Sequence, residues 1–149
     1  MNRQQHQLMR VVQKIPVFTG FTAEEAGKLL QLCHSHGYES GQTVYAAGEA
    51  SAEMLIVMTG QLSVHSHAGE HLAKIRPGEC TGEMGIFTGH PRSASIVAEE
   101  DSTGFVIGKR ELVSLLAANK DMFIKLLQNL VSLLSERLVT ANLRIDADQ

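Results

Sequence analysis

From residue 34 onward the sequence breaks into short apolar runs that are separated by glycine-containing turns. The runs predict strands at residues 34–40, 43–45, 54–59, 62–67, 71–75, 95–98 and 104–108. Turn signals fall between them, at Gly41, Gly48, Gly60, Gly69 and Pro77-Gly78. Many short strands at regular spacing favour an antiparallel sandwich, a jelly roll or a small barrel.

Helical patterns flank these strands on both sides. Residues 5–14 place apolar side chains on one face, and Thr22 with Glu25 three residues later forms a capping box that predicts the start of a second helix. After the last strand, residues 109–118 predict a short helix and residues 120–144 a long one without glycine or proline. The strands are therefore expected between two helical segments.

The long C-terminal helix carries two neighbouring apolar stripes. One is a seam of alternating four- and three-residue steps, as in a coiled coil: Leu127, Val131, Leu134, Leu138, Ala141 and Ile145. The other consists of Leu126, Leu130 and Leu133. One stripe can cover the strands while the seam meets a second copy, which predicts a homodimer through this helix. The alternative is one wide face buried against the sheet.

The composition describes one ordinary globular domain over residues 1–149, with a helical lead-in at 1–33, a β-roll at 34–108 and C-terminal helices at 109–146. The hydrophobic fraction is 44% and the net charge is −3, so no basic surface suggests nucleic acid as a partner. No apolar run approaches the ~20 residues of a membrane span, and the polar start is not a signal peptide. Cys33 and Cys80 are expected as free thiols. These features predict a cytoplasmic protein with no membrane partner.

Residues 82–95 are too polar and too rich in glycine for a core element and suit a ligand cradle. Arg92 offers a planar fork of donors that matches phosphate oxygens two at a time. Ionised Glu83 only accepts hydrogen bonds, so it suits hydroxyl donors. The pattern predicts a small ligand that carries a phosphate and a ribose hydroxyl.

The backbone of the same stretch supports this interpretation. The residues after Gly82 can form one short helical turn whose free N–H groups favour an anion. Gly85 permits close approach of the backbone to a ligand. Pro91 biases His90 toward an extended conformation, so a strand is expected to follow.

This stretch resembles the phosphate-binding cassette of the cyclic-nucleotide-binding domain family. Residues 82–86, Gly-Glu-Met-Gly-Ile, and residues 91–96, Pro-Arg-Ser-Ala-Ser-Ile, fit the family pattern, and residues 44–60 match its first signature. Two positions depart from the cassette pattern, because Thr81 replaces an aromatic residue and Gly85 replaces the common alanine. Ser51 departs from the first signature, where a glycine or alanine is common. The charged pair of the cassette is unaffected by these departures.

The resemblance implies an α+β fold: an eight-stranded antiparallel, jelly-roll-like β-roll with N-terminal helices, a short phosphate-cassette helix and two C-terminal helices. It implies a regulatory sensor that binds cAMP or cGMP and signals through movement of its C-terminal helices, with a separate effector protein as a further partner. Ser93 leaves the base open, with cAMP favoured. No DNA-binding module follows the last helix, so the chain is expected to be a stand-alone sensor or the sensor part of a longer protein.

The resemblance also assigns roles to residues. Glu83 takes the ribose 2′-hydroxyl, Arg92 takes the cyclic phosphate, and the amides of Gly85 and Ser93 assist at the phosphate. Val64 and Leu72 line the base pocket, and Thr140 and Asn142 form the lid. The full predicted ligand set is Gly82, Glu83, Met84, Gly85, Arg92, Ser93, Ala94, Val64, Leu72, Thr140 and Asn142.

Two other functions remain open. His34 with His36, and His65 with His67, each place two imidazoles on one face of a strand, as in a cupin-type metal enzyme. The glutamate that follows each pair comes too early for that pattern, so solvent-facing histidines are the preferred interpretation and no metal is expected. No nucleophile motif occurs, so the chain is not expected to be an enzyme. The second alternative is a degenerate domain that only dimerises.

Overall fold

The computed structural model describes the backbone of residues 2–148 and the side chains of residues 2–143. The described residues form eight strands in two four-stranded antiparallel sheets. One sheet has the order β1 (His34–Tyr38), β8 (Ser102–Gly108), β3 (Glu53–Thr59), β6 (Cys80–Thr81). The other has the order β2 (Thr43–Tyr45), β7 (Ser95–Ala98), β4 (Leu62–His65), β5 (His71–Ile75). The predicted α+β jelly-roll-like fold is confirmed.

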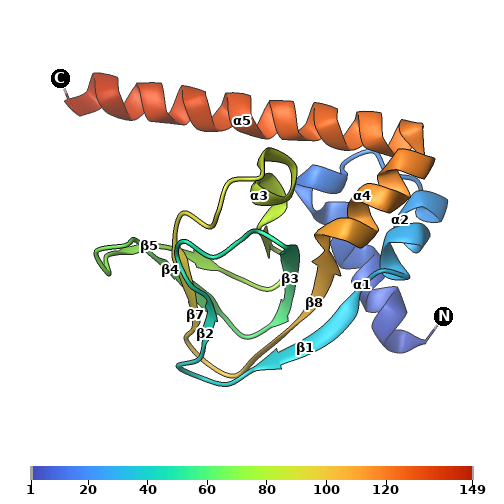
Figure 1. Ribbon diagram of the computed structural model, residues 1–149, viewed down its shortest axis with the longest axis horizontal. Helices are drawn as coiled ribbons and strands as arrows, with labels where there is room; N and C mark the ends of the chain where they lie inside the picture. The colour runs from blue at the N-terminus through green and yellow to red at the C-terminus, as the bar shows by residue number, and fades with distance from the viewer. Residues whose placement is uncertain (1, 149) are drawn as a thin grey trace.

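Helices precede, interrupt and follow the strands. The lead-in contains α1 (Arg3–Lys14), the short helix η1 (Pro16–Phe18) and α2 (Ala23–Leu30). The six-residue helix α3 (Glu83–Thr88) stands between β6 and β7, and α4 (Lys109–Ala118) and α5 (Lys120–Asp148) close the chain. The predicted capping box at Thr22 is present. Figure 1 shows the lead-in helices and α4 gathered at one end of the sheets, while α5 crosses the molecule above α3.

The first part of α5 belongs to the larger hydrophobic core. Met122, Leu126 and Leu130 are buried, and they pack in one cluster with the lead-in helices, α4 and residues of β3 and β8. The Asn129 side-chain amide donates to the carbonyls of Val17 and Thr19, each at 2.9 Å. This half of α5 is therefore fixed to the body of the domain.

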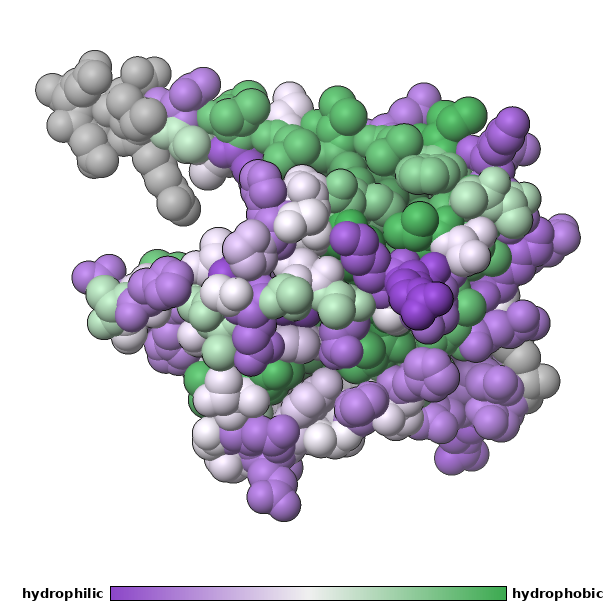
Figure 2. All heavy atoms as spheres, viewed as in Figure 1, coloured by the Kyte–Doolittle hydropathy of each residue, from purple (hydrophilic) through white to green (hydrophobic). Residues whose placement is uncertain are grey.

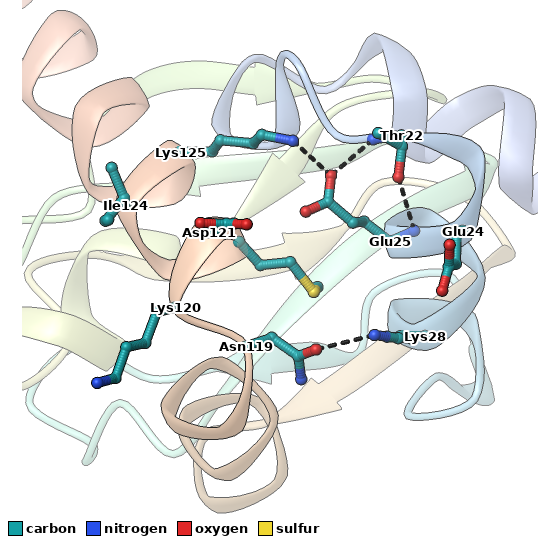
Figure 3. A pocket seen from close by; sticks show the side chains of 10 residues that line it. Thr22, Glu24, Glu25, Lys28, Asn119, Lys120, Asp121, Ile124 and Lys125 are labelled. Atoms are coloured by element: carbon teal, nitrogen blue, oxygen red, sulfur yellow. Dashed lines mark hydrogen bonds and ion pairs between the residues drawn. The ribbon is translucent and has the colours of Figure 1, made fainter.

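Charged contacts add to this attachment at the start of α5. Lys125 donates to the Glu25 carboxylate at 2.6 Å, and Lys28 donates to the Asn119 side chain at 2.8 Å (Figure 3). These groups line a surface cavity of about 590 Å³ between α2 and α5. The hydrogen bond from Lys125 is the main reason that the pKa of Glu25 is lowered.

The second part of α5 presents its apolar seam to solvent. Leu134 and Leu138 are 47% and 65% exposed, and Leu127 and Val131 are exposed as well. In Figure 2 the apolar side chains form a band along this helix. The Ile145 side chain lies outside the described residues. In the other stripe Leu126 and Leu130 are buried and Leu133 is half-buried, whereas the described seam residues are exposed. That the seam meets a second copy stays a prediction. Within residues 2–148, none of the helices combines the length and the apolar character that a membrane crossing requires.

Candidate ligand-binding site

A cavity of about 470 Å³ lies between residues 82–95, the sheet that contains β4, and α5. All of the predicted ligand residues except Leu72, Thr140 and Asn142 line it. Its wall from the β-roll and cassette includes Val64, Ile75, Gly82, Glu83, Met84, Gly85, Arg92, Ser93, Ala94 and Ile96. Its wall from α5 consists of Leu134 and Arg137. The cavity therefore combines apolar surface with one acid and two guanidinium groups.

The Arg92 guanidinium is buried and is held by the Glu53 carbonyl and the Tyr45 ring. It is 8% exposed, its Nη2 donates to the Glu53 carbonyl at 2.7 Å, and its carbon lies 3.5 Å from the centroid of the Tyr45 ring. The Tyr45 hydroxyl in turn donates to the Glu53 carboxylate. Burial and that carboxylate raise the pKa of Tyr45, which keeps the hydroxyl a neutral donor. The guanidinium is thus fixed between a ring and a carbonyl.

The Nε of Arg92 is the feature that points to a ligand. Among the described side chains, Arg92 Nε is the one buried nitrogen or oxygen atom that has no hydrogen-bond partner. A buried donor without an acceptor costs about 1–3 kcal/mol. An anion in the cavity would supply the missing acceptor, and a phosphate matches the planar edge of the guanidinium.

The main chain around Arg92 is equally constrained. Its N–H donates to the Glu49 carbonyl and its carbonyl accepts from Gly48 N–H, both at 2.8 Å. Gly82 caps α3 with φ 93°, and a Cβ at that position would lie 2.9 Å from Arg92 Nη1. Glycine at position 82 therefore serves both the left-handed backbone and the close approach of the guanidinium.

Glu83 begins α3 and is also 8% exposed. Its Oε1 lies 3.4 Å from Arg137 Nη2 of α5, and its Oε2 accepts from the Cys80 thiol at 3.7 Å. Burial, together with the nearby Glu83 charge, raises the pKa of Cys80, so this thiol stays protonated. The carboxylate is therefore an acceptor within the cavity whose present partners are a weak thiol and one long ion pair.

Comparison with known proteins agrees with this geometry. Residues 35–119 match the family described as the cyclic nucleotide-binding domain. The chain belongs to this family. It is 29% identical over 135 residues to the cyclic AMP receptor protein of Thermus thermophilus, which covers 88% of this chain and 61% of that protein. It is 26% identical over 131 residues to glutaminase 1 of Bradyrhizobium diazoefficiens, which covers 88% of this chain and 21% of the enzyme.

Solved structures give the same answer. A cyclic nucleotide-binding domain from Methylobacillus flagellatus superimposes with a TM-score of 0.81 at 27% identity, covering 99% of this chain and 85% of that one. The Thermus thermophilus catabolite activator protein superimposes with a TM-score of 0.75 at 29% identity, covering 88% and 62% of the two chains. This cyclic nucleotide-binding domain thus spans less than two thirds of the curated relatives described here.

Three predicted ligand residues are not brought into the cavity of this domain. Leu72 is 57% exposed on the edge strand β5, where Ala73 is the residue opposite Val64. Leu72 itself falls at the irregularity where the register shifts from the Val64–Ala73 pair to the His65–His71 pair, and it does not line the cavity. Thr140 and Asn142 are exposed beyond the part of α5 that lines the cavity. Leu134 and Arg137 occupy that position instead.

The structure also reveals site residues that the sequence reasoning missed. In the sequence, Arg137 is a charged residue beside the apolar seam and carries no motif of its own. Its position three residues after Leu134 is the signal that places both side chains on one face of the helix. Tyr45 and Glu53 lie on strands β2 and β3, 47 and 39 residues before Arg92, and no local pattern links them to it.

The histidine pairs do not take part in the cavity. His34 and His36 are exposed on β1, and His65 shares a 2.8 Å hydrogen bond with Ser63 and lies edge-on to His71. Across the part of the chain with described side chains, no three metal-ligating groups come together.

Proposed function

We propose that residues 1–149 form a sensor that binds a cyclic nucleotide, cAMP in preference to cGMP, and transmits occupancy through α5. The observation that carries this proposal is the buried Arg92, whose Nε has no partner in a cavity that also holds Glu83. The names of two relatives, a cyclic AMP receptor protein and a cAMP-dependent protein kinase regulatory subunit, favour cAMP.

The expected pose follows from the chemistry of the cavity. The cyclic phosphate accepts from Arg92, the ribose 2′-hydroxyl donates to Glu83, and the base lies toward Val64 and Leu134. The 2′-hydroxyl and Arg137 then compete for the same carboxylate. Nucleotide binding would thereby loosen the contact that joins the second half of α5 to the cassette.

We further propose that the chain regulates rather than catalyses. The glutaminase match spans only 21% of that enzyme, which fits a binding module that occurs within longer proteins. An effector can be a separate protein or another part of a longer chain.

We also propose a homodimer along the exposed seam of α5. Val131 and Leu138 alternate with Leu127 and Leu134 at the three- and four-residue steps of a coiled-coil seam. Sedimentation of the wild type should show a dimer, and V131S/L138S should shift it to monomer. V139S is the matched control, because Val139 is exposed but lies off the seam. A monomeric wild type at high micromolar concentration would contradict the dimer.

Isothermal titration with cAMP and cGMP in parallel tests the sensor function. A dissociation constant of micromolar or below, which is about 8 kcal/mol, is expected for cAMP. The absence of heat and of thermal stabilisation with both nucleotides would instead support the dimerising scaffold. Near-stoichiometric bound metal in protein without a histidine tag would favour the cupin-type enzyme.

A further inference from the structure

Two positions at which this chain departs from the family patterns, Ser51 in the first signature and Gly85 in the cassette, lie against each other. Ser51 belongs to the loop of residues 46–52 between β2 and β3, and Gly85 belongs to α3. A Cβ at position 85 would lie 2.2 Å from Ser51 Oγ and 2.5 Å from Ser51 Cβ. Carbon atoms do not approach this closely, so the Ser51 side chain occupies the space that a side chain at 85 would need.

Ser51 also reaches the other end of the cassette. Its hydroxyl donates to the His90 carbonyl at 2.8 Å, two residues before Arg92. The same loop forms the two backbone hydrogen bonds to Arg92, through Gly48 and Glu49, and Ala47 N–H donates to Ser95 Oγ at 3.0 Å. The loop is thus a platform on which residues 90–95 rest, and Ser51 is the part of it that contacts both α3 and residue 90.

The platform connects to the C-terminal helices as well. The Ala52 carbonyl, next to Ser51, accepts from Lys109 N–H at 2.8 Å, where α4 begins. A shift of Ser51 would therefore affect α3, the chain before Arg92 and the start of α4 together.

We propose that Ser51 is a positioning residue for the phosphate site, and that it works as a pair with Gly85. It fills the place of the missing side chain at 85, and through His90 it fixes where Arg92 and the Gly85 backbone face the cavity. This role rests on the proposed nucleotide binding. The pairing itself depends only on the contacts described.

The pairing makes a sharp prediction about substitutions at both positions. G85A forces a methyl group into the Ser51 side chain and should weaken cAMP affinity about tenfold or more, as expected for overpacking. G85A/S51G removes both clashing atoms and should recover to within about threefold of S51G alone. G85A/S51A should not recover, because the Cβ at 51 remains. S51A alone, which loses only the bond to His90, should weaken binding by about threefold to tenfold.

The affinities are measured by isothermal titration at about 10 °C, once thermal unfolding has shown that each variant is folded at that temperature, so that lost stability alone does not appear as lost binding. G37A is the matched glycine-to-alanine control, because a Cβ at Gly37 meets no atom within 4 Å. It should bind cAMP within about twofold of the wild type. Wild-type affinity in G85A, or recovery in G85A/S51A equal to that in G85A/S51G, would overturn the pairing.

A second readout separates this proposal from the nucleotide-binding proposal. Hydrogen exchange of residues 85–92 without ligand should speed up in G85A, return toward wild type in G85A/S51G and stay fast in G85A/S51A. If the wild type binds neither nucleotide, the sensor function and the role of Ser51 at the phosphate site fail, while this exchange pattern still decides the pairing. Additive changes in exchange would overturn the pairing even if nucleotide binds.

Discussion

The two walls of the cavity are built in different ways. In the cassette wall, Arg92 and Glu83 are nearly buried, and Arg92 is fixed by its backbone, by the Glu53 carbonyl and by the Tyr45 ring. In the α5 wall, Leu134 is about half exposed, and the exposed Arg137 side chain touches the cassette through one 3.4 Å contact. The cassette wall is therefore preformed, and we expect the α5 wall, with its fewer contacts, to be adjustable.

This difference assigns separate tasks to the two walls. A preformed donor set gives affinity, because little ordering is needed when the ligand binds. A ligand can shift a helix from one position to another only if it binds more tightly to one of the two conformations. Since α5 is fixed as far as Leu130, we expect any response to lie in the residues that follow.

The largest effect is expected from Arg92 in the preformed wall. R92A removes two charge-assisted donors, each worth about 1.5–3 kcal/mol, and should weaken cAMP binding by roughly 100-fold or more. R92K keeps the charge but not the planar fork, and should fall between R92A and wild type. Isothermal titration gives the affinities, and thermal unfolding checks that each variant folds. Wild-type affinity in R92A would remove Arg92 from the site.

Glu83 should give a smaller loss that depends on the sugar. E83Q should weaken cAMP binding about tenfold, because a neutral amide accepts the 2′-hydroxyl less strongly than a carboxylate does. The affinity for 2′-deoxy-cAMP should hardly change, because that ligand lacks the donor. Equal losses for the two ligands in parallel titrations would show that Glu83 does not recognise the ribose.

Arg137 tests the adjustable wall. The Arg137 side chain is exposed and its contact with Glu83 is long, so we expect this ion pair to contribute only about 0.2–1 kcal/mol and R137Q to change cAMP affinity by less than about fivefold. E136Q, at the exposed neighbouring position, serves as the control. A loss as large as that in R92A would reverse the comparison and make α5 the primary binding wall.

The smallest effect concerns the start of α5, where Lys125 lowers the pKa of Glu25. Because the pKa of Glu25 is lower in the folded chain, its ionised form stabilises the domain at pH values above about 4.5, the pKa in the unfolded chain. This contribution disappears as the pH falls through the folded-state pKa. E25Q should therefore cost about 0.5–1 kcal/mol at about pH 7 and progressively less at acidic pH, as the pH falls through the folded-state pKa of Glu25. Urea unfolding measures the cost at neutral and at acidic pH, with E24Q as a control of equal charge change. An E25Q deficit that persists at the acidic pH would show that the ionised carboxylate is not its cause.

The cassette could be predicted from the sequence because its chemistry is local. Glu83 and Arg92 lie nine positions apart on a stretch whose glycines and proline set its backbone. Whether Leu72, Thr140 and Asn142 reach the ligand depends on which face of their strand or helix is turned toward the cavity. An error of one residue in a helix turns a side chain by about 100° around the helix axis. The two-residue strand β6 is too short to show any periodicity.

The support behind Arg92 could not be predicted for a different reason. Tyr45, Ser51 and Glu53 come close to the cassette only once the strands have paired into the two sheets. No spacing in the sequence encodes that contact. Ser51 and Gly85 each look like an isolated departure from the pattern. In the structure they prove to be two sides of one contact.

The crystal structure of this domain with cAMP tests the account most directly. We predict a phosphate oxygen within about 2.7–3.2 Å of Arg92 Nε, with the ribose on Glu83. A nucleotide bound elsewhere, or an Arg92 Nε that still lacks an acceptor in the complex, would contradict it.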